Sequence, residues 1–173
     1  MSIEEILKSE NVTDAIKNNI DYILDFIPEI RFMIGFDHKH PHHHLDVYKH
    51  TLYALSLSEN DFEIRLCLLL HDIGKPFSYQ EGEVRNFKNH ALASSILAKE
   101  ILKRLNYDNQ FIEEVCYLIR YHDTPIKKSD IDSNYELALK RYKIQECDAL
   151  AHHPDKLEKR IKYLKKVNSL LKN

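Results

Sequence analysis

Histidine and aspartate stand in this chain at places where an amphipathic helix gains nothing from them. The pair His71 and Asp72 directly follows the most apolar run of the sequence, residues 66–70. Burying an imidazole or a carboxylate costs several kcal/mol unless the group is paired or bound to a metal, so these side chains need a partner. Four further positions share the pattern, and they are His50, His90, His122 and Asp148.

A divalent metal held by His nitrogen and Asp oxygen atoms is the simplest partner for such a set. No thiolate belongs to the set, which favours Mn, Fe, Co, Ni or Zn in a mixed nitrogen and oxygen site over a structural zinc bound by cysteines. We expect the ligands to come from separate helices and to converge in the core of a helical bundle.

The elements that carry these residues are predicted to be helices. The chain has only 3 Gly among 173 residues, and Leu, Ile, Lys and Glu recur at helical spacing with no sustained strand-type alternation. With 43% hydrophobic residues and a formal net charge of -2, the composition suits one domain with a single core, over residues 1–173. We therefore predict an all-α fold with the metal site in the core of the bundle.

Capping residues and apolar periodicity locate the helices. Thr13 is expected to cap a helix that runs through Ile27, and Pro28 to start a short continuation to about residue 36. Asp46 is expected to cap the next helix. The helix after it is expected to begin near Asn60 or Asp61 and to end at Gly74 and Pro76. Further helices are predicted over 47–57, 60–73, 89–105 (or from 86), 109–122, 135–151 and 154–172, with loops over 37–45, 75–88 and 127–134. Two apolar faces are predicted, one with Leu92, Ile96, Leu97, Ile101, Leu102 and Leu105, the other with Leu157, Ile161, Leu164 and Leu171.

Composition also excludes several classes of protein. No G-x-G-x-x-G and no G-x-x-x-x-G-K-[ST] occurs, which excludes enzymes that bind nucleotides through a glycine-rich loop. The longest apolar run is five residues, far short of the roughly 20 that a membrane span needs, and the N-terminus lacks a basic segment, so we expect a cytoplasmic protein with no membrane partner. Three widely separated cysteines are expected to be buried thiols, namely Cys67, Cys116 and Cys147.

Five ordered motifs resemble the HD-domain superfamily of metal-dependent phosphohydrolases. They are V-Y-K-H-T at 47–51, L-L-H-D-I-G-K-P at 69–76, N-H-A-L-A-S-S at 89–95, R-Y-H-D at 120–123 and E-C-D-A-L-A-H at 146–152. The segment 35–51 is similar to the HD domain attached to bacterial CCA-adding tRNA nucleotidyltransferases, and the resemblance covers roughly residues 32–152. Since only a short helical segment precedes residue 32, we expect an HD domain that stands alone and does not add CCA.

The resemblance implies roles for individual residues. His50, His71, Asp72 and Asp148 would bind one metal, and His90 with His122 would complete a second site that Asp72 bridges. The cofactor would be one or two divalent ions, with Mn, Fe, Ni, Co, Zn and Mg all open. Such metals polarise a phosphoryl oxygen and activate water, so the implied reaction is phosphoester hydrolysis without a covalent nucleophile. The substrate-contacting residues would be Lys75, on a phosphate oxygen, and His42 and His43, at the mouth.

The expected substrate is a phosphorylated small molecule or nucleotide, either a phosphodiester such as a 2′,3′-cyclic phosphate or a phosphomonoester. No G-Y-P element follows the HD pair, and no E-D element either, which argues against cyclic-di-GMP and alarmone hydrolases.

Two other functions stay open. Some HD-fold proteins with the same six ligands are di-iron oxygenases. A non-catalytic, metal-stabilised module is the second alternative, and it would bind nucleotide or RNA through the basic C-terminal helix, where residues 155–172 hold seven Lys or Arg against two acids.

Several polar residues near the motifs have open roles. Asp123 either supports a ligating histidine or starts a turn, and His152 either faces the site or marks a helix end. A solvated loop is the expected place of His38, His40 and His44.

Overall fold

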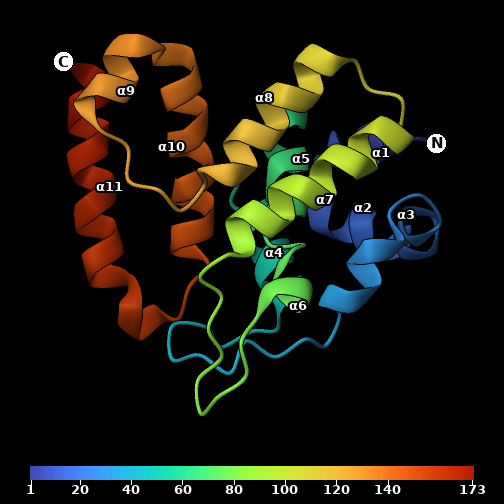
Figure 1. Ribbon diagram of the computed structural model, residues 1–173. Coiled ribbons are helices and arrows are strands. Elements are labelled where there is room, and N and C mark those ends of the chain that lie inside the picture. The colour runs from blue at the N-terminus through green and yellow to red at the C-terminus, as the bar shows by residue number, and fades with distance from the viewer.

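Helices make up the regular structure of the computed structural model, which describes residues 1–173, and the only β pairing is an isolated bridge between Gln80 and Asn86 (Figure 1). The prediction of an all-α fold is therefore confirmed. The elements are α1 (Ile3–Leu7), α2 (Val12–Asn18), α3 (Ile20–Phe26), η1 (Pro28–Met33), α4 (Val47–Ser56), α5 (Phe62–Leu70), α6 (Lys75–Ser78), α7 (His90–Arg104), α8 (Asn109–Arg120), α9 (Lys128–Ser133), α10 (Tyr135–Leu150), η2 (Pro154–Lys156) and α11 (Leu157–Lys172).

Helix α5 is the centre of the main core. It packs against α1, α4, α8 and α10, and every residue from Ile64 to Leu70 is buried. A helix that is apolar on all sides is stable only when other helices surround it, so the sequence of α5 itself demands this central place. The site-bearing pair His71 and Asp72 follows directly from this rigid element.

One charged side chain, Arg65, lies among the apolar residues of α5 with only 4% of its surface exposed. Its guanidinium donates hydrogen bonds to the carbonyl oxygens of Leu7 (2.7 Å) and Ser9 (2.8 Å) and to the side chain of Asn60 (3.0 Å). Carbonyls at the end of a helix lack partners within that helix. Arg65 supplies hydrogen-bond donors to these carbonyls, and so it ties the end of α1 to the start of α5.

The C-terminal helices form a second layer beside the main core, with α9, α10 and α11 at the left in Figure 1. They enclose a smaller apolar cluster of Ile126, Ile131, Ala138, Val167 and Leu171. Helix α10 also contacts α4, α5 and α8, which joins this layer to the rest of the molecule. Helix α10, which bears Asp148, therefore packs against α9 and α11 on one side and against the main core on the other.

Most helix positions agree with the sequence prediction. Asp46 caps α4 through a hydrogen bond from the Lys49 amide (2.7 Å), and Asp61 caps α5 through the Ile64 amide (2.9 Å). Local capping chemistry thus located both helices correctly. All three cysteines are free and buried, as expected.

The N-terminal helix prediction was wrong in detail. Asn11, not Thr13, caps α2, and the expected continuous helix is interrupted at Asn19. The Asn19 side chain donates a hydrogen bond to the Ala15 carbonyl (2.8 Å), which also accepts one from the Asn19 backbone amide (3.2 Å), so this side chain competes with the helical hydrogen bond at the boundary.

Three other boundaries differ from the prediction. The helix expected to reach Ile73 ends at Leu70, and a separate short helix, α6, begins at Lys75 inside the expected loop 75–88. Pro76 lies in the first turn of α6, where its missing N–H costs nothing. Helix α9 occupies most of the expected loop 127–134 because Ile131 is buried in the second apolar cluster.

Three side chains predicted on buried faces are exposed instead. Leu92 and Ile96 of α7 are 45% and 57% exposed, and Ile161 of α11 is 37% exposed. The buried stripe of α11 runs through Leu164, Val167 and Leu171. None of the helices has both the length and the apolar character to cross a membrane.

Candidate metal centre

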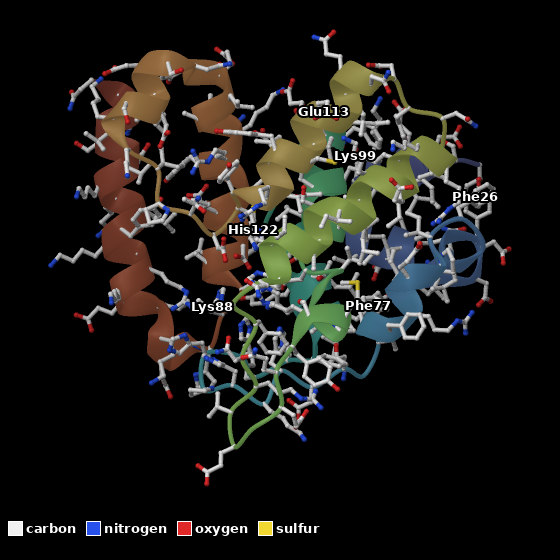
Figure 2. All side chains as sticks on the ribbon, in the orientation of Figure 1. Phe26, Phe77, Lys88, Lys99, Glu113 and His122 are labelled. Carbon is white, nitrogen blue, oxygen red and sulfur yellow. The ribbon has the colours of Figure 1, made fainter.

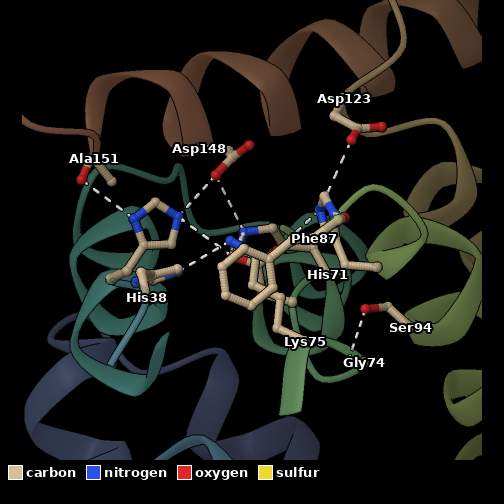
Figure 3. Close-up of polar contacts among 12 residues, drawn as sticks. His38, His71, Gly74, Lys75, Phe87, Ser94, Asp123, Asp148 and Ala151 are labelled. Carbon is tan, nitrogen blue, oxygen red and sulfur yellow. Dashed lines mark hydrogen bonds and ion pairs between the residues drawn. The ribbon is translucent and has the colours of Figure 1, made fainter. Parts of the chain in front are cut away.

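Gly74 determines how the HD pair sits against the next helix. A Cβ atom at this position would lie 2.4 Å from the Ser94 backbone nitrogen in α7, so only glycine fits. The Gly74 amide donates a hydrogen bond to the Ser94 hydroxyl (2.9 Å), which Figure 3 draws. This close approach brings the start of α7, and with it His90, to the carboxylate of Asp72.

Four side chains from three segments form the first ligand set. His50 comes from α4, His71 and Asp72 follow α5, and Asp148 comes from α10. Asp148 Oδ1 lies 2.8 Å from His50 Nε2 and 3.2 Å from His71 Nε2. Figure 3 marks the contacts of the Asp148 carboxylate with dashed lines. Asp72 Oδ2 lies 3.7 Å from His50 Nε2 and 3.3 Å from His71 Nε2. One candidate ligand atom from each residue lies within 4.8 Å of the others, a spacing that one ion can bridge.

The second ligand set shares Asp72 with the first. Its other oxygen, Oδ1, lies 3.4 Å from His90 Nε2 at the start of α7 and 3.9 Å from His122 Nε2 just after α8. His122 lies at the inner end of α8 in Figure 2, whereas Lys99 and Glu113 pair across the outer surface of α7 and α8 (2.8 Å). The two oxygens of Asp72 thus face two different sets, which is the arrangement of a bridging carboxylate.

Backbone carbonyls orient all four of these histidines in the same way. The Nδ1–H groups of His71, His90 and His122 each donate to the carbonyl three residues earlier, at 2.6 Å. His50 donates to the Ala151 carbonyl at 3.2 Å. A carbonyl only accepts, so Nδ1 carries the proton, and Nε2 is the atom turned toward the carboxylates. Metal-ligating histidines are held by this kind of hydrogen bond.

Two features of the site call for a cation. Both carboxylate oxygens of Asp72 are buried and neither accepts a hydrogen bond. The Lys75 ammonium pairs with Oδ2 at 2.9 Å, whereas the basic nitrogen nearest to Oδ1 is His90 Nε2 at 3.4 Å. The Nε2 atoms of His90 and His122 face each other at 3.2 Å although Nδ1 holds the proton of each ring. Two lone pairs at this distance repel unless a positive charge lies between or beside them. The residues present therefore fit divalent metal at both ligand sets.

The charges of the carboxylates favour the same conclusion. Burial would raise the pKa of Asp72, but His71 and Lys75 outweigh it and hold that pKa well below its usual value. The pKa of Asp148 is also well below its usual value, since hydrogen bonds from His50 and His71 outweigh its burial. Burial lowers the pKa of His71, yet the two carboxylates raise it to about 10. A metal ion would replace that proton on His71.

Comparison with known proteins assigns the family. The family model described as HD domain matches residues 42–165. The chain belongs to the HD domain family. This family is of the metal-dependent hydrolase type, and its members bind divalent metals. The predicted resemblance is thereby confirmed, while the individual metal-ligand roles stay predictions that the geometry supports.

Three curated relatives are similar to parts of this HD chain. The CC-adding tRNA nucleotidyltransferase of Thermus thermophilus is 32% identical over 105 residues, 56% of this chain and 24% of the relative. The multifunctional CCA protein of Hahella chejuensis is 30% identical over 139 residues, covering 78% and 31%. The A-adding tRNA nucleotidyltransferase of Deinococcus radiodurans is 29% identical over 96 residues, covering 51% and 22%. The chain thus spans less than a third of the length of these relatives.

A polar cavity of about 530 Å³ in the HD domain opens onto the two ligand sets. Asp72, Asp148, His90 and His122 line it, so both sets of candidate ligands are reachable from the cavity. Asp123 lies at its rim with its Oδ2 3.8 Å from His90 Nε2. His90 already donates its Nδ1–H to the Phe87 carbonyl, so Asp123 does not hold this ring by a hydrogen bond, and Asp123 lies in the turn that follows α8.

Lys75 lies in the wall of this cavity, only 4% exposed. Its ammonium is 2.9 Å from Asp72 Oδ2 and donates a hydrogen bond to His38 Nε2 (3.0 Å). Burial and the charge of Lys75 lower the pKa of His38 to about 2, so this ring is a neutral acceptor. Lys75 is thus held beside Asp72, which belongs to both candidate ligand sets, and its contact with substrate phosphate stays a prediction.

The expectation that His38 lies on a solvated loop was wrong. His38 has no exposed surface, and its Nδ1–H donates to the Leu45 carbonyl (2.8 Å) while Lys75 occupies Nε2. The loop 37–45 folds back over the HD pair, a long-range contact that helical periodicity does not report. Of the other two histidines placed on this loop, His40 is half-buried in the cavity wall and His44 is exposed.

His42 and His43 lie at two different cavities. His43 lines the main cavity and stacks on His38, with ring centroids 3.7 Å apart and planes 8° apart. His42 lines an adjoining cavity.

His152, for which the sequence left two roles open, lines both cavities, and burial lowers its pKa to about 4. Arg160 of α11 also lines both, and the charge pattern of α11 alone did not distinguish it from the other basic residues.

Proposed function

We propose that this HD domain is a metal-dependent phosphohydrolase and that its substrate is a phosphoester of nucleotide type. The observation that carries the proposal is the division of Asp72 between two ligand sets at the base of an open polar cavity. Two metals side by side are typical of enzymes that displace one oxygen of a phosphoryl group by another. The cavity volume lies within the roughly 300–1,000 Å³ of sites for small molecules.

The side chains of the cavity also support hydrolysis by water. No serine, threonine or cysteine lines it, so a hydroxyl or thiol nucleophile is not at hand. The cysteines are buried elsewhere, and burial raises the pKa of Cys67 and Cys116. Bound divalent metals would supply polarisation of the phosphoryl oxygen and activation of water.

The chain's own residues would then orient and neutralise the substrate. Asp72 would contribute one carboxylate oxygen to each ligand set and so fix the position of the two sets relative to each other. Lys75 offers a fixed positive charge beside Asp72, where a phosphate oxygen would be attracted to it. Asp123, 46% exposed at the rim next to His90, is placed to accept a proton from an incoming water or to give one to the leaving oxygen.

The names of the curated relatives support the proposal of a nucleotide substrate. Three curated relatives are named as tRNA nucleotidyltransferases or as a CCA protein. Both a 2′,3′-cyclic phosphodiester and a phosphomonoester of a nucleotide suit a polar cavity with Lys75 and Arg160 in its wall. We propose the cyclic phosphodiester as the first substrate to test.

The test is hydrolysis of adenosine 2′,3′-cyclic phosphate and bis-p-nitrophenyl phosphate. The protein is stripped of metal and reloaded separately with Mn, Ni, Co, Mg, Zn or Fe. Asp72→Ala is run beside wild type, and Asp25→Ala, which removes an exposed acid far from the HD pair in sequence, is the matched control. We expect cleavage with a transition metal in wild type and in Asp25→Ala, and none in folded Asp72→Ala.

Two results would count against the proposal. Cleavage that persists in Asp72→Ala would mean a contaminating enzyme. A folded, metal-bearing wild type that cleaves no diester and no nucleotide monoester would refute the hydrolase proposal, and substrate-dependent oxygen uptake by the iron form would then support an oxygenase.

A further inference from the structure

A second cavity of about 450 Å³ adjoins the metal centre on the side of α11. It shares five lining residues with the main cavity, namely His122, Asp123, Asp148, His152 and Arg160. The two are therefore lobes of one depression, with the candidate ligands Asp148 and His122 at the boundary. Whatever group occupies the second lobe would be attached to, or lie beside, the group at the metals.

The far wall of the second lobe is held rigidly. Tyr163 of α11 donates a hydrogen bond to Gln145 Oε1 on α10 (2.7 Å) and accepts one from the Ile126 amide (2.8 Å). Gln145 in turn donates to the Thr124 carbonyl (2.7 Å). This network joins α10, α11 and the segment after α8, so the lobe is formed before any ligand arrives.

Arg160 lines this lobe without an anionic partner. It is half-buried and forms no ion pair, and its one hydrogen bond is to the Lys156 carbonyl (3.3 Å). Asp148 attracts it, but His50 and His71 already occupy Oδ1 of that carboxylate. A guanidinium has five donors in a planar fork and costs free energy to desolvate, so its free donors call for an anion with several oxygens.

A second cation of α11 faces the same lobe. Lys159 lines it beside Arg160, and it too forms no ion pair. His42, on the opposite loop, lines the same lobe, and burial together with the positive charges of Arg160, Lys156 and Lys159 lowers its pKa. The lobe therefore concentrates positive charge next to a metal centre suited to phosphate.

We propose that the second lobe binds a second phosphate of the same substrate, one nucleotide away from the phosphate at the metals. Arg160 and Lys159 receive this group, which makes the substrate class a nucleotide with two phosphates on one ribose or the end of a ribonucleotide chain. The inference rests on the proposed function for the phosphate at the metals. Arg160 acts here in binding and selection, and it takes no part in breaking the bond.

The test compares two ligands that differ in one phosphate, adenosine 3′-monophosphate and adenosine 3′,5′-bisphosphate. Their dissociation constants are measured by calorimetry on metal-loaded wild type, Arg160→Gln and Lys166→Gln. Lys166 is the matched control, since it is an exposed cation of the same helix that lines neither lobe. Released phosphate is assayed in parallel, and the titrations are run with a divalent metal that supports no release.

We expect wild type to bind the bisphosphate about tenfold more tightly than the monophosphate, the gain from one charge-assisted hydrogen bond of about 1.4 kcal/mol. Arg160→Gln is expected to remove that preference, and Lys166→Gln to keep it. Circular dichroism checks that each variant is folded.

Three outcomes would overturn the inference: equal affinity of wild type for both ligands, a preference that survives in Arg160→Gln, or equal losses in Arg160→Gln and Lys166→Gln, which would indicate general attraction by α11. A preference found without hydrolysis of any ester would refute the hydrolase proposal alone and leave the binding site standing. Hydrolysis without the preference would refute the second-phosphate site alone.

Discussion

The bridging position of Asp72 predicts that single substitutions remove either one metal or both. Asp72 Oδ2 faces His50 and His71, and Oδ1 faces His90 and His122. Asp72→Asn therefore weakens both sites at once. His122→Ala removes a ligand only from the second set, which has three candidate members against four in the first. We expect two metals per chain in wild type, one in His122→Ala and none bound tightly in Asp72→Asn.

The size of the effect on stability follows from linkage. A site filled at one hundred times its dissociation constant stabilises the fold by about 2.7 kcal/mol. For a domain of 150 to 250 residues, each kcal/mol moves the melting temperature by about 2–4 °C, so each site contributes about 5–11 °C. Wild type should gain about twice that on metal addition, His122→Ala about one such step, and Asp72→Asn close to nothing.

The assay is a thermal melt of each protein with chelator and with metal, together with metal content after gel filtration. The gain on metal addition is compared within each variant, so that any loss of stability in the metal-free form cancels. Asp25→Asn, an exposed acid, controls for the removal of a charge and should keep the full gain. Two metals in His122→Ala, or one tightly bound metal in Asp72→Asn, would refute the bridging role.

Three further predictions concern the scaffold. Gly74→Ala should lower the free energy of unfolding by about 3 kcal/mol, since its Cβ would meet the Ser94 backbone at 2.4 Å; urea denaturation measures this, and an unchanged midpoint would contradict it. Arg65→Met should cost about 1–3 kcal/mol in the same assay, because the buried Leu7 carbonyl loses its donor, whereas an effect below that range would mean that water replaces the guanidinium. The thiols of Cys67, Cys116 and Cys147 should react slowly with a thiol reagent until urea unfolds the protein, because burial raises the pKa of each thiol. Fast labelling of the native protein would contradict this burial.

The six candidate ligands were accessible to sequence reasoning because each is costly in its local context. A histidine or aspartate beside a buried apolar run needs compensation, and this requirement holds whatever the rest of the fold does. The caps at Asp46 and Asp61 were accessible for a similar reason, since a cap bonds to amides two or three residues away. Local chemistry did not suffice everywhere, since Asn11 and not the expected Thr13 caps α2.

The residues around the ligands were not accessible in the same way. His38 lies on a loop without periodicity, and its burial depends on Lys75, 37 positions later in the chain. The same holds for the end of α5, where Gly74 was expected to stop the helix. Its small size instead serves the approach of α7, and the helix has already ended at Leu70. Contacts between distant segments decide these features, and the local pattern does not contain them.

Arg160 is an intermediate case, because the sequence holds a signal for it that depends on the register of α11. The side chains that pack α11 against its neighbours are Leu164, Val167 and Leu171, which follow residue 160 by 4, 7 and 11 positions. These spacings define one face of a helix, so Arg160 continues the buried stripe toward the N-terminal end of α11. Ile161 lies outside this buried stripe and is exposed. A cation at the end of an apolar stripe differs from the solvated lysines around it, because packing of the stripe turns it inward. Since the stripe ends beside Asp148 and His152 in the cavity wall, the same packing that stabilises α11 also places a positive charge next to the candidate ligand Asp148.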